Sequence, residues 1–189
     1  MVLLETTPLA QGSVYALSVS GVCDISFNKN PIAPDTVKYI QTDVMGQGLL
    51  RQVWYNCDSS LSTLTSKATY PNSPDLVDSV ASFASPIDWG DNYGQKLSGL
   101  IIPPLTGSYT FWICSDDDSE LWLSTDESPT HKRRIAYLYG WAPVNTWDNY
   151  ASQKSSPVSL TANKTYYIEG IQTDGTGGDH IIVQWQLPS

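Results

Sequence analysis

Apolar and polar residues alternate with a period of two along most of the chain, and this pattern predicts β-strands. For example, Tyr109, Phe111 and Ile113 fall on one face of an extended strand, and Thr110 falls on the other. Aromatic and β-branched residues dominate these segments, as is typical of half-buried strands. The segments with this pattern are 15–19, 97–101, 109–114, 121–123, 166–170 and 181–185.

Gly- and Pro-rich turns separate these segments at short intervals, as in residues 103–107 and 175–178. No stretch of twelve residues carries a helical stripe. One or two turns of helix are predicted at about 58–66, where Leu61 and Leu64 lie three residues apart. Many short strands joined by turns indicate an all-β protein, either an antiparallel β-sandwich or a barrel.

The first 46 residues differ from the rest. An Asn- and Pro-rich loop at 28–35 separates two strands predicted near 13–19 and 37–44. We expect these to be outer strands of the same sandwich, so that residues 1–189 form a single domain. A linker from a preceding domain is the alternative. The N-terminus does not resemble a signal peptide, because Glu5 interrupts it. We therefore expect a domain of a larger protein.

Acidic residues outnumber basic ones by 19 to 10, which gives a formal net charge of −9. The phosphate backbone of a nucleic acid would be repelled overall, so no nucleic acid is expected as a partner, and cations or neutral polar ligands are favoured. Only 15% of the residues are charged, a composition common in secreted β-proteins. No apolar run approaches 18 residues, so we expect no membrane insertion.

The chain has three cysteines, Cys23, Cys57 and Cys114, without the close spacing of a metal site. Two alternatives stay open. One is a single disulfide, with Cys23 and Cys57 as the best pair because Cys114 falls within a strand pattern. The other is three free thiols.

The densest group of acids is the run Asp116-Asp117-Asp118 between two predicted strands. Adjacent carboxylates repel one another by about 1 kcal/mol at about 4 Å even in water, and neighbours in an extended strand point to opposite faces. A kinked chain that turns two of them to one side would suit calcium, which takes about six to eight oxygen ligands. A solvated acidic turn is the alternative from this motif alone.

Three further loops contain candidate binding residues, one for a cation and two for a sugar. Residues 174–180 place acids around three glycines, which free the backbone to turn its carbonyl oxygens inward. An ordinary hairpin loop is the alternative. Residues 88–94 and 137–150 mix aromatic and polar side chains, which suits sugars, because a ring face takes the apolar side of a pyranose. Core packing is the alternative for these aromatic residues.

The chain shows no catalytic constellation. It has two histidines, His131 and His180, and neither a nucleophile elbow nor a metalloprotease motif. Asp116 and Asp117 are neighbours, so they are poorly placed to flank a glycosidic bond on opposite sides. We therefore do not expect an enzyme.

The order of the motifs resembles the protective-antigen (PA-14) domain family over about residues 47–188. This resemblance implies an antiparallel β-sandwich, a PA-14-like jelly-roll or barrel-like sandwich with long loops at one end. Members occur in adhesins, flocculins, glycosidases and toxins, and several are calcium-dependent lectins. The motifs that carry the resemblance are Gly48-Leu49-Leu50-Arg51, Trp54-Tyr55, residues 88–94, residues 103–111, residues 115–122 and residues 177–185.

The resemblance also implies a calcium site in which two aspartates joined by a cis peptide bond supply carboxylates. Asp116 and Asp117 match these positions, because Leu121-Trp122 follows at the family's spacing. The ligands expected from the late loop are Thr176 and Gly177 by backbone oxygens and Asp179 by its side chain, with Asp174 and Gln172 as weaker candidates.

Together these observations predict a calcium-dependent carbohydrate-binding module, of the lectin or adhesin kind, from an extracellular or cell-surface protein. Vicinal hydroxyls of the sugar would coordinate the calcium directly, and glycans of cell surfaces or polysaccharides would be the partners. We expect a monomeric domain. The alternative is a structural or protein-interaction domain in which calcium only rigidifies the loops. The residues expected at the sugar are Asp116, Asp117, Asp179, His180, Trp141 and Asp91.

Overall fold

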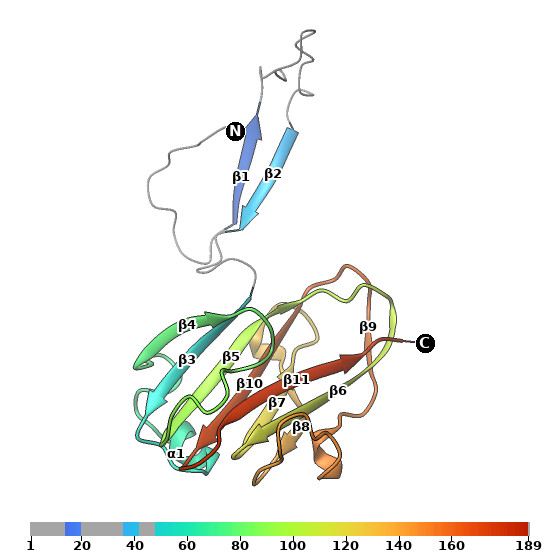
Figure 1. The fold of residues 1–189 in the computed structure, drawn as a ribbon. Helices are drawn as coiled ribbons and strands as arrows, with labels where there is room; N and C mark the ends of the chain where they lie inside the picture. Colours follow the sequence, from blue (N-terminus) through green and yellow to red (C-terminus); the bar gives the residue numbers. More distant parts are fainter. Residues whose placement is uncertain (1–13, 20–35, 42–47, 189) are drawn as a thin grey trace, which may run out of the picture. The chain divides into compact units, whose positions relative to one another are not determined.

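The computed structural model describes residues 48–188 in full, together with the backbone of two further strands, Val14–Val19 (β1) and Thr36–Gln41 (β2) (Figure 1). These two strands pair antiparallel with each other. The chain divides into two compact units, Met1–Gln47 and Gly48–Ser189. The expectation that residues 1–46 add outer strands to the sandwich stays a prediction, and Cys23 lies outside the described residues.

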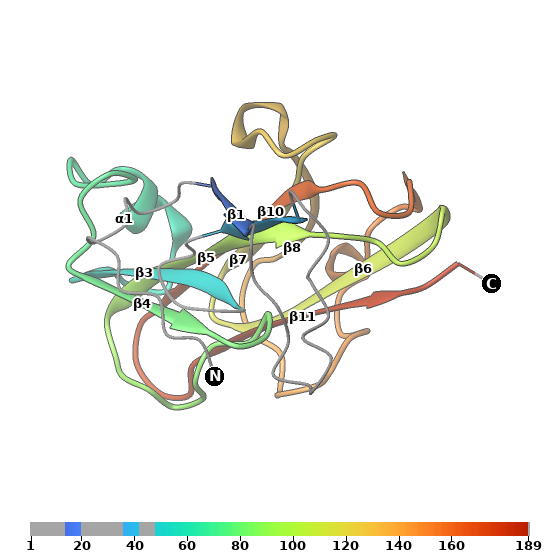
Figure 2. The ribbon, with the colours of Figure 1, turned by 90° about the horizontal axis from the view of Figure 1, so that it is seen from above.

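The larger unit is an antiparallel β-sandwich, which confirms the predicted all-β fold (Figures 1 and 2). Its strands are β3 Leu49–Tyr55, β4 Leu76–Val80, β5 Tyr93–Ile101, β6 Gly107–Asp116, β7 Ser119–Leu123, β8 Arg133–Leu138, β9 Val158–Leu160, β10 Tyr166–Asp174 and β11 His180–Gln186. The order is β4-β3-β5-β10-β7-β8 in the six-stranded sheet and β11-β6-β9 in the three-stranded sheet.

The core lies between the two sheets and is made by the alternate residues that the sequence pattern indicates. Tyr109, Phe111 and Ile113 of β6 are all buried, and they belong to one cluster with Leu121 of β7 and Ile168 of β10. Burial of a side chain of this size contributes roughly 1.5–3 kcal/mol each. The two sheets therefore form a rigid base for the loops that join them.

The helix predicted at about 58–66 forms over Leu61–Thr65 (α1), and two short 3₁₀ turns occur at Pro129–His131 and Ala151–Gln153. Leu61 and Leu64 of α1 are buried against the larger sheet. In the described part of the chain, no helix is long and apolar enough to cross a membrane.

Four connections reach one end of the sandwich, the lower end in Figure 1, and the one after β4 runs down to it from the upper end. They join β4 to β5 (residues 81–92), β6 to β7 (117–118), β10 to β11 (175–179) and β8 to the second 3₁₀ turn (139–150). The hydrogen bonds between them, described below, make this end the candidate functional region.

One testable consequence concerns the packing between the sheets at Gly170 of β10. A Cβ atom at this position would lie 2.8 Å from Phe83 Cε1 and 3.0 Å from Ile181 Cδ1. We expect Gly170→Ala to lower the free energy of unfolding by about 1–3 kcal/mol, measured by urea denaturation. Gly90→Ala is the control, because its Cβ would meet nothing within 4 Å. Equal stability of the two variants would contradict this packing.

Candidate functional site

The predicted acidic run lies in the tight connection between β6 and β7, and its three aspartates are half-buried. The peptide bond between Asp116 and Asp117 is cis. Two backbone hydrogen bonds tie the connection to β10. Asp117 N donates to Thr173 O at 2.9 Å, and Thr173 N donates to Asp118 O at 3.0 Å. The larger sheet therefore fixes the position of the acidic run.

The loop between β10 and β11 lies beside this run. Gly175 N donates to Asp117 Oδ2 at 3.0 Å. A Cβ atom placed on Gly178 would lie 3.4 Å from Asp88 Oδ1 and 3.5 Å from Asp116 Oδ2. The fold therefore brings together the two acidic loops that the sequence analysis singled out, and it adds Asp88 from a third loop.

Asp174, at the end of β10, has the most unusual environment in the cluster. Its side chain is fully buried, and neither carboxylate oxygen has a hydrogen-bond partner among the described residues. Burial, followed by the charges of Asp179, Asp117 and Asp116, raises the pKa of Asp174 to about 7. Burial and the neighbouring Asp117 raise the pKa of Asp116 to about 6. In the described part of the chain, none of Asp116, Asp117 and Asp174 forms an ion pair with a basic side chain.

The environment of Asp174 fits a cation. Two like charges about 4 Å apart repel by about 4 kcal/mol at an effective dielectric constant of about 20. Within residues 48–188, no group of three His, Cys, Asp or Glu side chains is arranged to hold a metal ion by itself. Backbone carbonyls and water would have to complete the ligand set, and calcium accepts both.

Asp179, the predicted side-chain ligand, is buried and already anchors another loop. Its Oδ1 accepts a hydrogen bond from Tyr93 Oη at 2.9 Å, and its Oδ2 accepts one from Gly90 N at 2.8 Å. Burial, together with the charge of Asp179, raises the pKa of Tyr93, so this hydroxyl stays a donor. The structure assigns Asp179 an anchoring role, and its contact with a metal stays a prediction.

The other predicted residues of the late loop divide into two groups. Thr176 and Gly177 are exposed at the loop's tip, and Gly177 has a φ of 117°, a value that favours glycine. Gly177 N donates to Oδ1 of the exposed Asp91 at 3.1 Å, which places Asp91 at the rim of the site. Gln172 is buried and donates to Asp116 O at 2.5 Å, so it supports the backbone of the acidic run.

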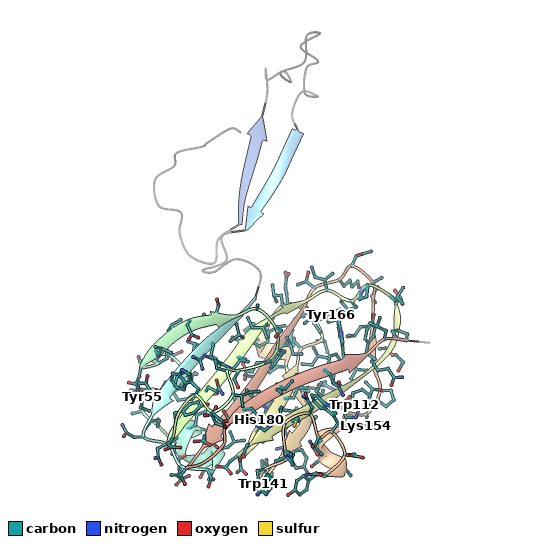
Figure 3. The ribbon with its side chains drawn as sticks, in the orientation of Figure 1. Tyr55, Trp112, Trp141, Lys154, Tyr166 and His180 are labelled. Atoms are coloured by element: carbon teal, nitrogen blue, oxygen red, sulfur yellow. The ribbon has the colours of Figure 1, made fainter. Side chains whose placement is uncertain are left out.

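His180 and Trp141, both predicted to contact a sugar, have opposite environments (Figure 3). His180 is only 3% exposed, its Nε2 lies 3.4 Å from Cys114 Sγ, and burial lowers its pKa. A side chain this deeply buried is not accessible to a sugar. Trp141 is 57% exposed, and Gly140 N donates to Asp118 Oδ1 at 2.7 Å, which ties its loop to the acidic run.

Among the other aromatic candidates of residues 137–150, Tyr139 is 49% exposed and Tyr150 is 42% exposed. Trp147 is half-buried and packs against a cluster formed by Cys114, Leu138 and Ala142, so core packing is its role. Cys57 and Cys114 are buried free cysteines.

The sequence motifs indicate Asp174 only as a weaker candidate and Asp88 only as part of a loop. The one feature of the sequence that draws attention to Asp88 is the motif Asp-Trp-Gly-Asp in which it stands. Its neighbour in the structure, Gly178, lies about 90 positions away in the chain. Such a contact leaves no local pattern.

The raised pKa values predict how stability depends on pH when divalent cations are removed. The folded protein keeps protons on Asp174 and Asp116 that the unfolded chain loses near pH 4. The free energy of unfolding in EDTA should therefore fall as the pH rises from about 4 to about 7. Urea denaturation at a series of pH values measures it. Asp174→Asn should make the decline smaller, and an unchanged profile would contradict the buried environment of this carboxylate.

Known proteins resemble the larger unit. Residues 47–189 match the PA14 domain family. The mouse N-acetyl-beta-glucosaminyl-glycoprotein 4-beta-N-acetylgalactosaminyltransferase 1 is 33% identical over 135 residues, which cover 69% of this chain and 13% of that protein. Mouse Fibrocystin-L is 32% identical over 146 residues, which cover 75% of this chain and 3% of that protein. The chain therefore spans a small part of each relative.

Solved structures share the fold at lower identity. The Epithelial Adhesin 9 A domain of Candida glabrata, in complex with Galb1-4GlcNAc, has a TM-score of 0.55 and 14% identity, covering 76% of this chain and 83% of that one. An anti-sigma factor domain-containing protein from Clostridium clariflavum has a TM-score of 0.50 and 17% identity, covering 82% and 48%. With the match over residues 47–189, these findings show that the chain belongs to the PA14 domain family.

Proposed function

We propose that the loop end of this PA14 domain binds a calcium ion and, through it, a carbohydrate. The observation that carries the proposal is the fully buried Asp174 carboxylate, whose two oxygens have no partner among the described residues. It lies among the charges of Asp116, Asp117 and Asp179, which raise its pKa. A buried charge needs a partner, and a hard dication would neutralise several carboxylates at once.

The residues that would hold the ion come from two loops. Asp116 and Asp117 would supply carboxylate oxygens, and Thr176 and Gly177 would supply backbone carbonyls from the exposed tip. The buried Asp174 would add its negative charge close to the ion. A bound calcium ion would offer its remaining coordination positions to vicinal hydroxyls of a sugar. Asp179 and Gln172 would keep the two loops in place through the hydrogen bonds described above.

Two exposed residues next to the site would contact the sugar. Trp141 presents an aromatic face on a loop tied to Asp118, and Asp91 lies at the rim beside Gly177. An aromatic face next to hydrogen-bonding groups is the usual composition of a sugar site. The structure of the Candida glabrata adhesin domain holds a galactose-containing disaccharide, which supports this ligand class.

The proposed setting is the cell surface or the extracellular space, within a larger protein and with glycans as partners. An adhesin domain and Fibrocystin-L are among the similar proteins, which supports this setting. We propose a binding role without catalysis.

Calcium binding is tested by titration calorimetry on the purified protein. We expect saturable binding of one calcium ion. Asp117→Asn and Asp174→Asn should each weaken it by at least about tenfold, because each removes a negative charge from the site. Glu127→Gln is the matched control, because it removes one exposed carboxylate from the loop between β7 and β8. No calcium uptake by the wild-type protein, or full affinity in Asp174→Asn, would refute the metal site.

Sugar binding is tested on a glycan array with and without EDTA. We expect binding that disappears in EDTA and that Trp141→Ala weakens by roughly tenfold, since an aromatic contact contributes on the order of 1 kcal/mol. The same variant should keep its calcium affinity. Leu105→Ala, an exposed apolar residue in the loop between β5 and β6, is the control. A protein that binds calcium but no glycan would support the alternative, a structural domain whose loops the ion rigidifies.

A further inference from the structure

A column of side chains links the edge of the six-stranded sheet to the loop between β4 and β5. Its base is Arg51 of β3, which is 2% exposed. Arg51 Nε donates to Asp78 Oδ1 at 2.8 Å, and Arg51 Nη2 donates to Asp78 Oδ2 at 2.7 Å. A guanidinium held by two parallel hydrogen bonds has a fixed plane. Its Cζ lies 4.5 Å from the ring centre of Trp89, so it supports the indole in one place.

Two tyrosines hold the same indole from the ends of strands. Tyr93 of β5 meets Trp89 edge to face, with ring centres 5.0 Å apart and planes at 76°. Tyr55 of β3 stacks on Trp89, with ring centres 6.3 Å apart and planes at 10°. Strands thus fix Trp89, although it lies in a loop.

The loop residues beside Trp89 contact the candidate site directly. Asp88 N donates to Asp179 O at 3.0 Å, and Gly90 N donates to Asp179 Oδ2 at 2.8 Å. Asp91 Oδ1 accepts a hydrogen bond from Gly177 N at 3.1 Å. The loop that Trp89 anchors therefore holds both the base and the tip of the loop between β10 and β11.

The chemistry of Arg51 indicates a role beyond stability. It occupies an inward-facing position of β3 between Leu49 and Val53, both buried apolar residues. Its Nη1 is buried without a hydrogen-bond partner among the described residues. An ion pair whose guanidinium is buried with an unmet donor contributes little to stability compared with an apolar residue. Its orientation toward Trp89 is what an apolar side chain could not supply.

We propose that Arg51 and Trp89 are positioning residues of the metal site. They set the place of the loop between β4 and β5, which in turn sets the place of Asp179 and Gly177, so they tune calcium affinity without touching the ion. The part of this inference that concerns affinity rests on the proposed calcium site. The part that concerns the position of the loops holds for the metal-free protein as well.

The test combines two measurements on the wild-type protein, Arg51→Met and Arg51→Lys. The first is amide hydrogen exchange of Gly90 and Gly177 by NMR in EDTA, and the second is calcium titration by calorimetry. In Arg51→Met we expect both amides to exchange about tenfold faster and calcium to bind about tenfold more weakly, the range known for supporting residues around metal ligands. Arg51→Lys, which keeps a cation, should recover part of both effects.

Two controls separate positioning from lost stability. Lys154→Met removes a similar contact elsewhere, where Lys154 Nζ lies 5.3 Å from the ring centre of Trp112 (Figure 3). Ile168→Val removes one methyl group from the core and lowers stability away from the loops. Neither control should change calcium affinity or the exchange of Gly90 and Gly177 relative to amides of the core strands.

The results distinguish the positioning of the loops by Arg51 from the binding of calcium. Wild-type exchange rates and wild-type calcium affinity in Arg51→Met would overturn the inference. If Arg51→Met does not fold, Trp89→Phe weakens the same contact and should show the same two changes, and its failure to do so would overturn the inference. If the wild-type protein binds no calcium, the proposed function fails, and the exchange rates alone still decide whether Arg51 positions the loops.

Discussion

Repulsion among carboxylates at one end of the sandwich is the constraint on which the rest of this structure depends. Asp116, Asp117, Asp174 and Asp179 lie within reach of one another's charges, and two of them have raised pKa values. Hydrogen bonds from strand backbones hold them there, as the pairing between the acidic run and Thr173 shows. The sheets supply the rigidity, and the proposed calcium ion would supply the missing positive charge.

The sequence predicts the strands well where one face of the strand is buried and the other is exposed to solvent. It predicts them poorly where burial extends to both faces. In β3, neighbouring Val53 and Trp54 are both fully buried, so the period of two disappears. β10 extends four residues past its predicted end, through Gln172 and Asp174. The alternating pattern misses these residues because their polar side chains are buried as well. Hydrophobic patterning cannot detect a strand whose buried side chains are polar.

The candidate site has the same limit: local motifs in the sequence predict part of it, and contacts between residues far apart in the chain decide the rest. The motifs predict which loops matter, because glycines and clustered acids are visible in the sequence. They do not predict which acidic residues face a bound ion and which anchor a loop. Asp179 accepts hydrogen bonds from Tyr93 and Gly90, which lie nearly 90 residues away, and these partners decide that it anchors a loop. His180 begins β11 opposite Asp116, and this register turns its ring toward Cys114 and away from solvent.

The loop between β10 and β11 is fixed at its base and open at its tip. Gly175 O accepts a hydrogen bond from Asn92 N at 2.7 Å, and Asp179 is buried, whereas Thr176 is exposed. Substitutions at Thr176 therefore reach the outer surface of the site without disturbing the strands or the carboxylates below. In the proposed binding site, natural variation at this one position would change which ligands are accepted, and the scaffold that holds the charged centre would stay the same.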